Sequence, residues 1–486
     1  MNTLLARLRP QDPAQRIFVA FVVLLVVGGA TAVLAGTNLG LLPVVAAIGL
    51  GVLVVDWRWV YYLLLTTLAF SLQFPMPGGL SLDVPSEPLM LVLLGCFGVA
   101  VLAGRTGLTR REVAHPLVLL LGLTLLWAMV STMFSVDTAK SVKYLLAKTW
   151  YIGPFLFVTL MLLRRPSDVW KIAACHTFGA CLTVLYAAAR HAATGFSFDS
   201  INQALSPFYI NHVIYATVLA MLLPYAFYAA RSKTGLSRTA WRVAMVLMLF
   251  GLFTSYTRAS ILSLPVAGLF YVVMRLRLTR WVLIGAISAA VSGALYFVQE
   301  NNFMLYAPDF EKTIFNGDNF EKHLEATYKL EDVSGMERVY RWVAAVRMLA
   351  DKPLTGSGPS TFYPEYKRYT VKSFRTYVSD NPERSTTHNY FLLQLAEQGL
   401  PGFALFVLLL SATLLFTETL YHRAARQPQF RRVVLAAGLS LVVIVFHLLL
   451  NELIEVDKIG SFFFIGLAVL IRAEAWIDLT TTEEKA

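Results

Sequence analysis

Charged residues are scarce in this sequence. Only 15% of its 486 residues are Asp, Glu, Lys or Arg, whereas 57% are hydrophobic and the mean hydropathy is +0.61. A soluble domain usually carries about 25% charged residues, and a soluble fold of this length could not bury so much apolar surface. The composition therefore excludes a soluble enzyme, a secreted disulfide scaffold and a disordered chain. It favours a helical protein that crosses the membrane many times.

Cysteine is also scarce. The three cysteines, Cys96, Cys175 and Cys181, all fall inside apolar runs, so the sequence has no disulfide framework. No Cys and His spacing resembles a zinc site, and no glycine-rich phosphate loop or dinucleotide fingerprint occurs. We therefore expect neither a metal nor another cofactor, and ATP-driven transport has no support in the sequence.

Apolar runs of about 20 residues, the length of a membrane helix, are abundant. Fourteen candidate spans lie near 17–36, 41–55, 58–74, 87–104, 115–134, 144–163, 168–190, 208–230, 240–256, 259–275, 280–298, 388–420, 433–450 and 456–474. The pair within 41–74 could be two spans or one broken span, and 115–163 is less apolar. The sequence therefore predicts an all-α polytopic membrane protein with 12–14 transmembrane helices.

The positive charge indicates how these spans are oriented. If the N-terminus is cytoplasmic, 21 Lys and Arg lie in cytoplasmic flanks and five lie in short external loops. Cytoplasmic loops carry an excess of Lys and Arg, so both termini are expected in the cytoplasm. The net charge of +11 is then mainly an orientation signal, and we expect a lipid bilayer and no nucleic acid as a partner.

One connection is long, polar and predicted to be external. The expected organisation is N-terminal membrane helices over 1–298, a large periplasmic loop over 299–387, C-terminal membrane helices over 388–476 and a cytoplasmic tail over 477–486. Within the loop, the capping pair Ser334 and Glu337 predicts a helix that runs to about Asp351. Its expected apolar face consists of Val339, Trp342, Val343, Val346 and Leu349.

Several cationic or titratable residues fall at the external ends of the predicted spans. Arg258, His388, Arg190 and His212 all occupy such places. An Arg fork binds phosphate oxygens in a bidentate way, and a neutral His can accept a proton from an attacking hydroxyl. Two Arg and one His could thus hold a diphosphate leaving group and activate an acceptor. The structural alternative is that the Arg residues are snorkelling anchors and the His residues begin helices.

Three stretches resemble the O-antigen ligase family, which includes Wzy-type O-antigen polymerases. The first, Tyr256-Thr257-Arg258-Ala259-Ser260, is similar to the family's Ser-Arg-Gly/Ala element. The second contains Arg341-Trp342 and then the Pro-Leu-x-Gly-x-Gly turn over 353–362. The third is the His-Asn element that begins at His388 and continues through Glu397 to Gly402.

The resemblance implies a GT-C-like, metal-independent, inverting glycosyltransferase of the bacterial inner membrane. Such enzymes move a glycan from undecaprenyl diphosphate to an acceptor on the periplasmic side. By position, Arg258 and Arg190 would bind the diphosphate, and His388 would be the catalytic histidine. Asn389, His212 and Arg341 are expected in supporting places.

The acceptor is left open by these motifs. The leading hypothesis is O-antigen ligation, in which the acceptor is a sugar hydroxyl of lipid A-core. A Wzy-type polymerase of lipid-linked repeat units and a protein-glycosylating transferase remain alternatives. The long loop before His388 and the late segment 451–458 are unlike a typical ligase. A membrane transporter is the alternative from another class, although the sequence shows no inverted repeat.

Overall fold

The computed structural model of the chain describes residues 56–76, 80–299, 302, 333–371, 381 and 385–483. The chain divides into two units between residues 64 and 65, and apart from the start of α4 the features below belong to the second. The spans predicted over 17–36 and 41–55 lie outside the described residues.

Long apolar helices confirm the predicted all-α membrane fold. In the described part of the chain, nine helices are long and apolar enough to cross a bilayer. In chain order these are α7 (Pro116–Met133), α8 (Thr138–Ile152) continued by η3 (Gly153–Val158) and α9 (Thr159–Leu162), α10 (Pro166–Ala192), α12 (His212–Ser232), α13 (Gly235–Thr254), α14 (Arg258–Arg275), α15 (Thr279–Val298), α19 (Tyr390–Arg423) and α20 (Pro428–Leu448). The shorter apolar helix α5 (Ser86–Leu102) and the long helix α21 (Asp457–Glu483) also lie where spans were predicted.

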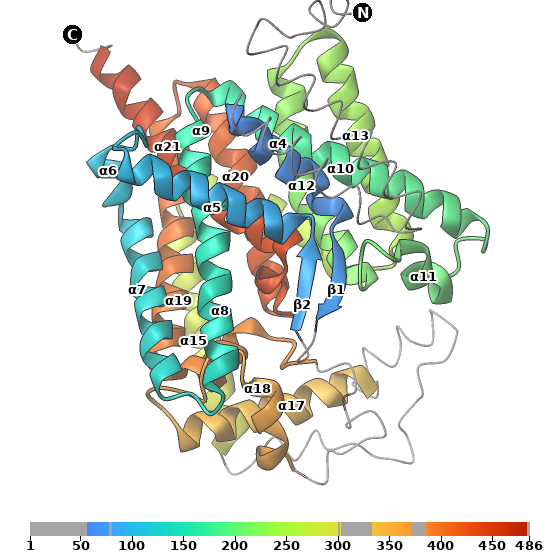
Figure 1. The fold of residues 1–486 in the computed structure, drawn as a ribbon, viewed down its shortest axis with the longest axis vertical. Helices are drawn as coiled ribbons and strands as arrows, with labels where there is room; N and C mark the ends of the chain where they lie inside the picture. The colour runs from blue at the N-terminus through green and yellow to red at the C-terminus, as the bar shows by residue number, and fades with distance from the viewer. Residues whose placement is uncertain are drawn as a thin grey trace, which may run out of the picture. The chain divides into compact units, whose positions relative to one another are not determined.

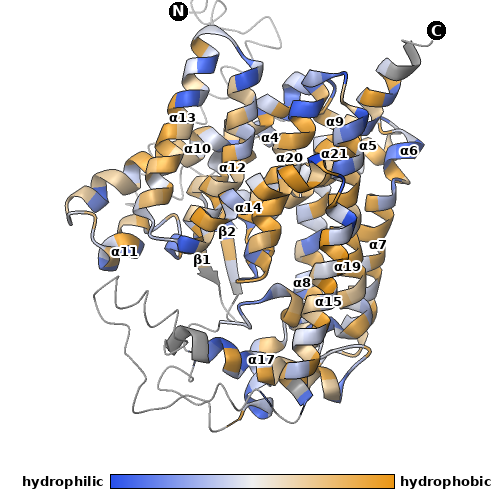
Figure 2. Cartoon of the chain, turned by 180° about the vertical axis from the view of Figure 1, so that it is seen from behind, coloured by the Kyte–Doolittle hydropathy of each residue, from blue (hydrophilic) through white to orange (hydrophobic). Residues whose placement is uncertain are grey.

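The central helices of this unit are α12, α20 and α21. Helix α20 packs against α12, α21 and α14, and α20 lies beside α12 in Figure 1. The most apolar window of α12 is 89% buried and that of α20 is 78% buried, whereas that of α15 is wholly unburied. The apolar surface of α15 therefore faces lipid. In Figure 2 the long helices are predominantly hydrophobic, and hydrophilic residues gather at their ends and on α17.

A small β-hairpin replaces the end of the span predicted over 58–74. Helix α4 (Arg58–Thr67) ends early and is followed by η2 (Leu68–Phe70). The antiparallel strands β1 (Leu72–Met76) and β2 (Leu80–Val84) then pair, with Leu72 opposite Val84. The sequence contains Pro75, which cannot continue a helix, and Leu80 to Val84 alternates apolar and polar residues in the strand period.

Helix α17 (Val333–Asp351) confirms the helix predicted in the loop, but its buried face is rotated from the predicted one. Of the predicted face only Val343 is fully buried, whereas Glu337, Arg341, Ala344 and Met348 are buried instead. The prediction was wrong because it assumed that the apolar side chains alone choose the face. Polar contacts of Arg341 turn that face towards the chain that precedes α19, as described below.

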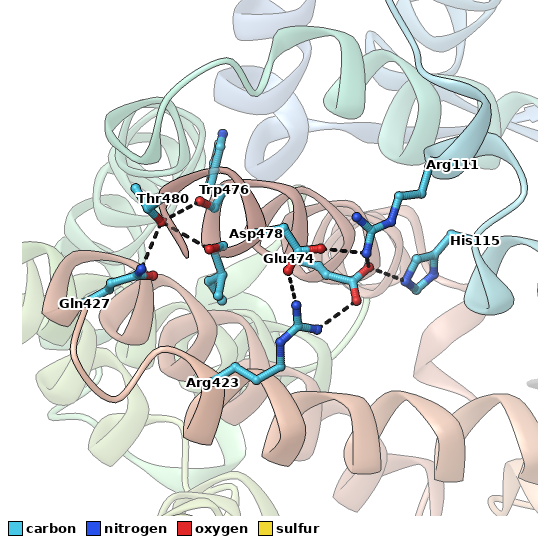
Figure 3. A network of polar contacts seen from close by, with 9 residues as sticks. Arg111, His115, Arg423, Gln427, Glu474, Trp476, Asp478 and Thr480 are labelled. Atoms are coloured by element: carbon cyan, nitrogen blue, oxygen red, sulfur yellow. Dashed lines mark hydrogen bonds and ion pairs between the residues drawn. The ribbon is translucent and has the colours of Figure 1, made fainter. Parts of the chain in front are cut away.

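An ion-pair network lies at the end of the bundle where α19 and α21 finish. Figure 3 shows Arg111 and Arg423 on either side of Glu474 and Asp478. Arg111 lies 2.6 Å from Asp478, Arg423 lies 3.0 Å from Glu474, and the His115 ring lies 3.5 Å from Glu474. Helix α19 has 34 residues with a non-helical residue at Gly399, and the part from Leu400 to Arg423 alone is roughly 35 Å long at about 1.5 Å per residue. The network therefore lies far from His388.

Candidate functional site

His388 lies two residues before the start of α19, next to the end of α20. Its backbone has a φ of +51°, a left-handed conformation that residues other than glycine seldom adopt. Its Nδ1 atom lies 3.1 Å from Oδ1 of Asn451, which follows α20. Because an amide oxygen can only accept, this contact has Nδ1–H as the donor and leaves the lone pair on Nε2. Nε2 has no hydrogen-bond partner among the residues that the structure describes.

Asn389 fixes the place of His388 from the neighbouring position. Its side-chain oxygen caps α19 by accepting a hydrogen bond from the Leu392 backbone N–H at 3.1 Å. Its Nδ2 donates to the Leu449 carbonyl at the end of α20, at 3.2 Å. Asn389 therefore joins the start of α19 to the end of α20; its supporting role in the site stays a prediction.

Helix α17 holds the same segment from the other side. Trp342 Nε1 donates to the Thr387 carbonyl at 2.9 Å, and Arg341 donates to the Thr386 carbonyl at 3.2 Å. Arg341 is buried and also pairs with Glu337 at 3.4 Å. The predicted supporting residue Arg341 is thus next to His388, and its Nε has no hydrogen-bond partner in the described part of the chain.

Burial and charge set the protonation state of His388. Burial lowers the pKa of this imidazole below its ordinary value of 6.5, and the positive charges of Arg341 and Arg338 lower it further. The Glu452 carboxylate and the hydrogen bond with Asn451 act in the opposite direction. Because the lowering prevails, His388 is neutral at neutral pH. Glu452 Oε2 is buried and lacks a hydrogen-bond partner among the described residues.

A chain of hydrogen bonds leads from the helix of Arg258 to His388. Arg258 is the first residue of α14. Two residues further, the Ser260 hydroxyl lies 2.9 Å from Nε2 of the buried His447 near the end of α20. The His447 carbonyl accepts from the Asn451 backbone N–H at 2.8 Å, and Asn451 contacts His388. The motifs that contain Arg258 and His388 are therefore tied to the same end of α20.

The backbone of His212 contacts the Arg258 motif. The Thr257 hydroxyl donates to the His212 carbonyl at 3.3 Å, so the start of α12 is fastened to the start of α14. The His212 ring lies 2.9 Å from the Asn202 side chain. These contacts support a structural role at the start of a helix.

Arg190 lies at the end of α10 and is exposed. It donates to the Tyr186 hydroxyl at 2.6 Å, to the Ala204 carbonyl at 3.4 Å and to the Ser206 carbonyl. The adjacent ring of His191 lies 6.4 Å from the ring of Tyr256, two residues before Arg258. The end of α10 is therefore close to the Arg258 motif. The Arg190 guanidinium, however, is hydrogen-bonded to Tyr186 and to the backbone carbonyls of Ala204 and Ser206. Its diphosphate role stays a prediction.

The glycine-rich turn 353–362, here called the docked turn, inserts into a break in α19. The break is at Gly399, where φ is +68° and ψ is −171°. The Leu400 N–H donates to the Pro353 carbonyl at 2.9 Å, and the Gly358 N–H donates to the Glu397 carbonyl at 2.8 Å. A Cβ at Gly399 would lie 2.1 Å from the Leu354 carbonyl oxygen. This motif position therefore requires glycine for both conformation and space.

The Glu397 side chain completes this attachment. Its two carboxylate oxygens accept hydrogen bonds of 2.8 Å from the backbone N–H groups of Phe362 and Ser360. Glu397 is 6% exposed, so both hydrogen bonds are formed away from water. The sequence motif gave no hint of this function, which is to hold the loop against α19 nine residues beyond His388.

Sequence reasoning missed three residues near His388: Arg338, Asn451 and Glu452. Arg338 lies on α17 one turn before Arg341. Asn451 and Glu452 form a polar pair directly after an apolar span, and that position was the available signal. In the described ranges, no group of three or more His, Cys, Asp or Glu side chains is placed to hold a metal ion.

Comparison with known proteins identifies part of this chain. No curated protein matches it. Residues 243–407 match the model of the family described as O-antigen ligase. The matched range begins in α13 and contains Arg258, α17, the docked turn, His388 and the break in α19. The end of α20, Asn451 and Glu452 lie beyond the matched range. Residues 243–407 therefore carry the O-antigen ligase domain, and the nine long apolar helices of the described residues are those of a multi-pass membrane protein.

Proposed function

We propose that this protein transfers a glycan from undecaprenyl diphosphate to a sugar hydroxyl on the periplasmic face of the inner membrane, with inversion and without a metal. The preferred acceptor is lipid A-core, which makes the reaction O-antigen ligation. The observation that carries the proposal is the place of His388, a neutral imidazole among cationic side chains at one end of an apolar helix bundle.

His388 is the proposed general base. Asn451 orients the ring, so Nε2 faces the reaction with its lone pair. In the transfer step, Nε2 takes the proton from the acceptor hydroxyl while that oxygen attacks the anomeric carbon. The bond from this carbon to the diphosphate oxygen breaks, and the diphosphate leaves with the electron pair. Glu452 then stabilises the imidazolium that forms, because an adjacent carboxylate favours the charged ring.

The diphosphate would be bound by arginine. Arg258 is the first residue of an 18-residue helix, so the positive end of the helix dipole adds to its charge. Arg341 and Arg338 place two further positive charges close enough to lower the pKa of His388. Preorganised cations of this kind stabilise the negative charge that develops on a departing diphosphate. Arg190 is proposed as an outer contact for the same group.

The test is loss of transfer in His388→Ala and Arg258→Ala cells, read from lipopolysaccharide gels beside immunoblots of the membrane fraction. Normal insertion with loss of long-chain lipopolysaccharide is expected. Arg347→Ala is a suitable control because Arg347 is an exposed arginine of α17 that contacts the Tyr369 carbonyl at 3.3 Å. Wild-type lipopolysaccharide in either site variant would refute the proposed roles.

The same gels separate the two acceptors. A ligase knockout should lose all long chains and accumulate lipid-linked polymer, whereas a polymerase knockout should leave a single repeat on the core. Metal independence is tested in purified protein by adding EDTA. Activity that disappears in EDTA and returns with a divalent cation would contradict it.

A further inference from the structure

A lysine lies inside one of the apolar spans. Lys148 is ten residues beyond the start of α8, in a stretch that is long and apolar enough to cross a membrane. Its side chain is 12% exposed, and its Nζ lies 5.0 Å from the centroid of the Tyr144 ring one turn earlier. An ionisable side chain within a membrane span is costly, so such a residue is expected to have a partner and a function.

The partner of Lys148 is Glu455, in the short helix η8 (Leu453–Glu455) that follows α20. The Lys148 Nζ lies 2.9 Å from one carboxylate oxygen and 2.8 Å from the other. The first of these oxygens also accepts a hydrogen bond from the Tyr390 hydroxyl at 2.5 Å. The Glu455 carboxylate therefore joins α8 to the first residue of α19. Both members of the ion pair lie outside residues 243–407, so the family match assigns them no role.

Glu455 is also tied to the residues that act on His388. Its backbone N–H donates to the Glu452 carbonyl at 3.0 Å, so these two residues belong to one turn. Glu452 acts electrostatically on the His388 ring, and Asn451, the residue before it, contacts that ring directly. From the other side, Tyr390 follows His388 by two residues. One carboxylate thus holds both of the chain segments that meet at His388.

Stability alone does not account for a buried ion pair of this kind. Taking two charges out of water costs about as much as their attraction returns, and apolar side chains of similar volume often stabilise a fold equally well. What the pair supplies is a fixed geometry, because the Lys148 Nζ is within reach of both oxygens of Glu455. That geometry sets the distance between the turn after α20 and the His388 ring.

We propose that Lys148 is a positioning residue for the transfer. Through Glu455 it holds the turn after α20 and the start of α19 together, and so keeps that turn in contact with the His388 ring. The effect on the ring follows from the contacts alone. Only its consequence for transfer rests on the proposed function.

Loss of the ion pair should change the protonation of His388. Glu452 and the hydrogen bond with Asn451 raise the pKa of this ring, whereas burial, Arg341 and Arg338 lower it. If the turn after α20 moves away, the two raising contributions weaken and the pKa falls further. The acid limb of kcat/KM should then move to lower pH. The value of kcat should fall at least about tenfold, because a misplacement of about 1 Å can cost about 100-fold in rate.

The experiment uses the full-length protein in nanodiscs, with isotope-labelled histidine rings. The NMR signal of His388 is assigned by its loss in His388→Ala, and its titration gives the pKa directly. Transfer is assayed on the same samples with undecaprenyl diphosphate-linked glycan and lipid A-core. The test variant is Lys148→Met with Glu455→Gln, which removes both charges and keeps an acceptor for the Tyr390 hydroxyl. We expect normal membrane levels, a lower pKa of His388, a lower kcat and an unchanged KM for the donor.

The matched control is Arg472→Met with Glu112→Gln. Arg472 is 15 residues beyond the start of α21 and pairs with Glu112 of the short helix α6 (Arg110–Val113). These side chains are similarly buried, at 16% and 4% exposed. The same kinds of substitution here should leave the His388 titration and kcat unchanged. Glu455→Gln alone keeps an oxygen for both donors. It should move both readings less than the double variant does, and it takes the place of the double variant if that one fails to insert.

Three results would overturn the proposal. A wild-type titration of His388 in the folded double variant would show that the ion pair does not position the ring. A lower kcat with an unmoved titration would mean that the pair acts elsewhere. Equal changes in the control would indicate a general loosening of the bundle. A failure of the proposed function is seen separately, because His388→Ala would then retain transfer while the lower pKa in the double variant persists.

Discussion

Replacing Glu397 by alanine tests whether the docked turn positions the site. The change removes the acceptor of the Phe362 N–H, which is buried, and of the Ser360 N–H, whose residue is exposed. A buried N–H without a partner costs about 1–3 kcal/mol, and a lost bond that water can replace costs about 1 kcal/mol. The expected loss of stability is therefore about 2–4 kcal/mol, concentrated where the loop meets α19.

Glu418→Ala is the matched control on the same helix. The Glu418 carboxylate also accepts two hydrogen bonds, from the Thr279 N–H at 3.2 Å and the Thr279 hydroxyl at 2.6 Å. Glu418 lies five residues before the end of α19 that carries Arg423, far from His388. Both variants should therefore lower the melting temperature by a few degrees. Only Glu397→Ala should also reduce transfer, by at least tenfold.

The measurements are melting of the detergent-solubilised protein followed by size-exclusion chromatography, and lipopolysaccharide gels from cells with equal membrane levels of each variant. Glu397→Gln should fall between Glu397→Ala and the wild type, because one acceptor oxygen remains. If Glu397→Ala melts early but transfers normally, the docked turn stabilises the fold without positioning His388. If it melts like the wild type, the hydrogen-bond reasoning itself fails.

Three further changes test the charges of the molecule. Arg258→Lys should lose most transfer at normal expression, since Lys lacks the bidentate fork; near-normal gels would refute diphosphate binding by this fork. In the pH profile of kcat/KM, the acid limb should lie below the ordinary His value of 6.5, because burial lowers the pKa of His388 and the base must be neutral. Asn451→Asp should shift that limb upwards, and an unmoved limb would exclude the contact. Burial raises the pKa of Asp83 from 3.8 to about 7. Between these two pH values the folded protein keeps a proton that the unfolded chain releases, so the free energy of unfolding falls as the pH rises through this range. Asp83→Asn should therefore raise the melting temperature more at pH 8 than at pH 5.

The sequence predicted the features that depend on local pattern. A run of apolar residues is enough to predict a membrane helix, and the predicted spans from α7 to α20 are confirmed. The hairpin of β1 and β2 was missed because its residues are also apolar and follow an apolar helix. In such a run, Pro75 and the two-residue alternation were the only signs of a strand.

Contacts between distant segments could not be predicted in this way. Asn451 meets His388 across 63 positions, and Glu397 meets Ser360 across 37. Neither partner is recognisable from its own neighbours in the sequence. The rotated face of α17 has the same origin, because Arg341 is buried by its contact with the Thr386 carbonyl. A pattern read from hydrophobicity alone assigns such a residue to solvent.

The left-handed backbone of His388 gives a physical reason for these attachments. Such a conformation in a residue other than glycine costs about 1–3 kcal/mol, and it persists only where the surroundings impose it. Here Trp342 of α17 binds the carbonyl of Thr387, the residue before His388. Asn389, the residue after it, binds the end of α20. Glu397 anchors the turn that follows α17. The motif residues therefore form two groups: those that impose the left-handed backbone of His388, and His388 itself, whose imidazole is placed by that backbone. Substitutions in the first group should act through the position of the ring, and substitution of His388 should act through the chemistry alone.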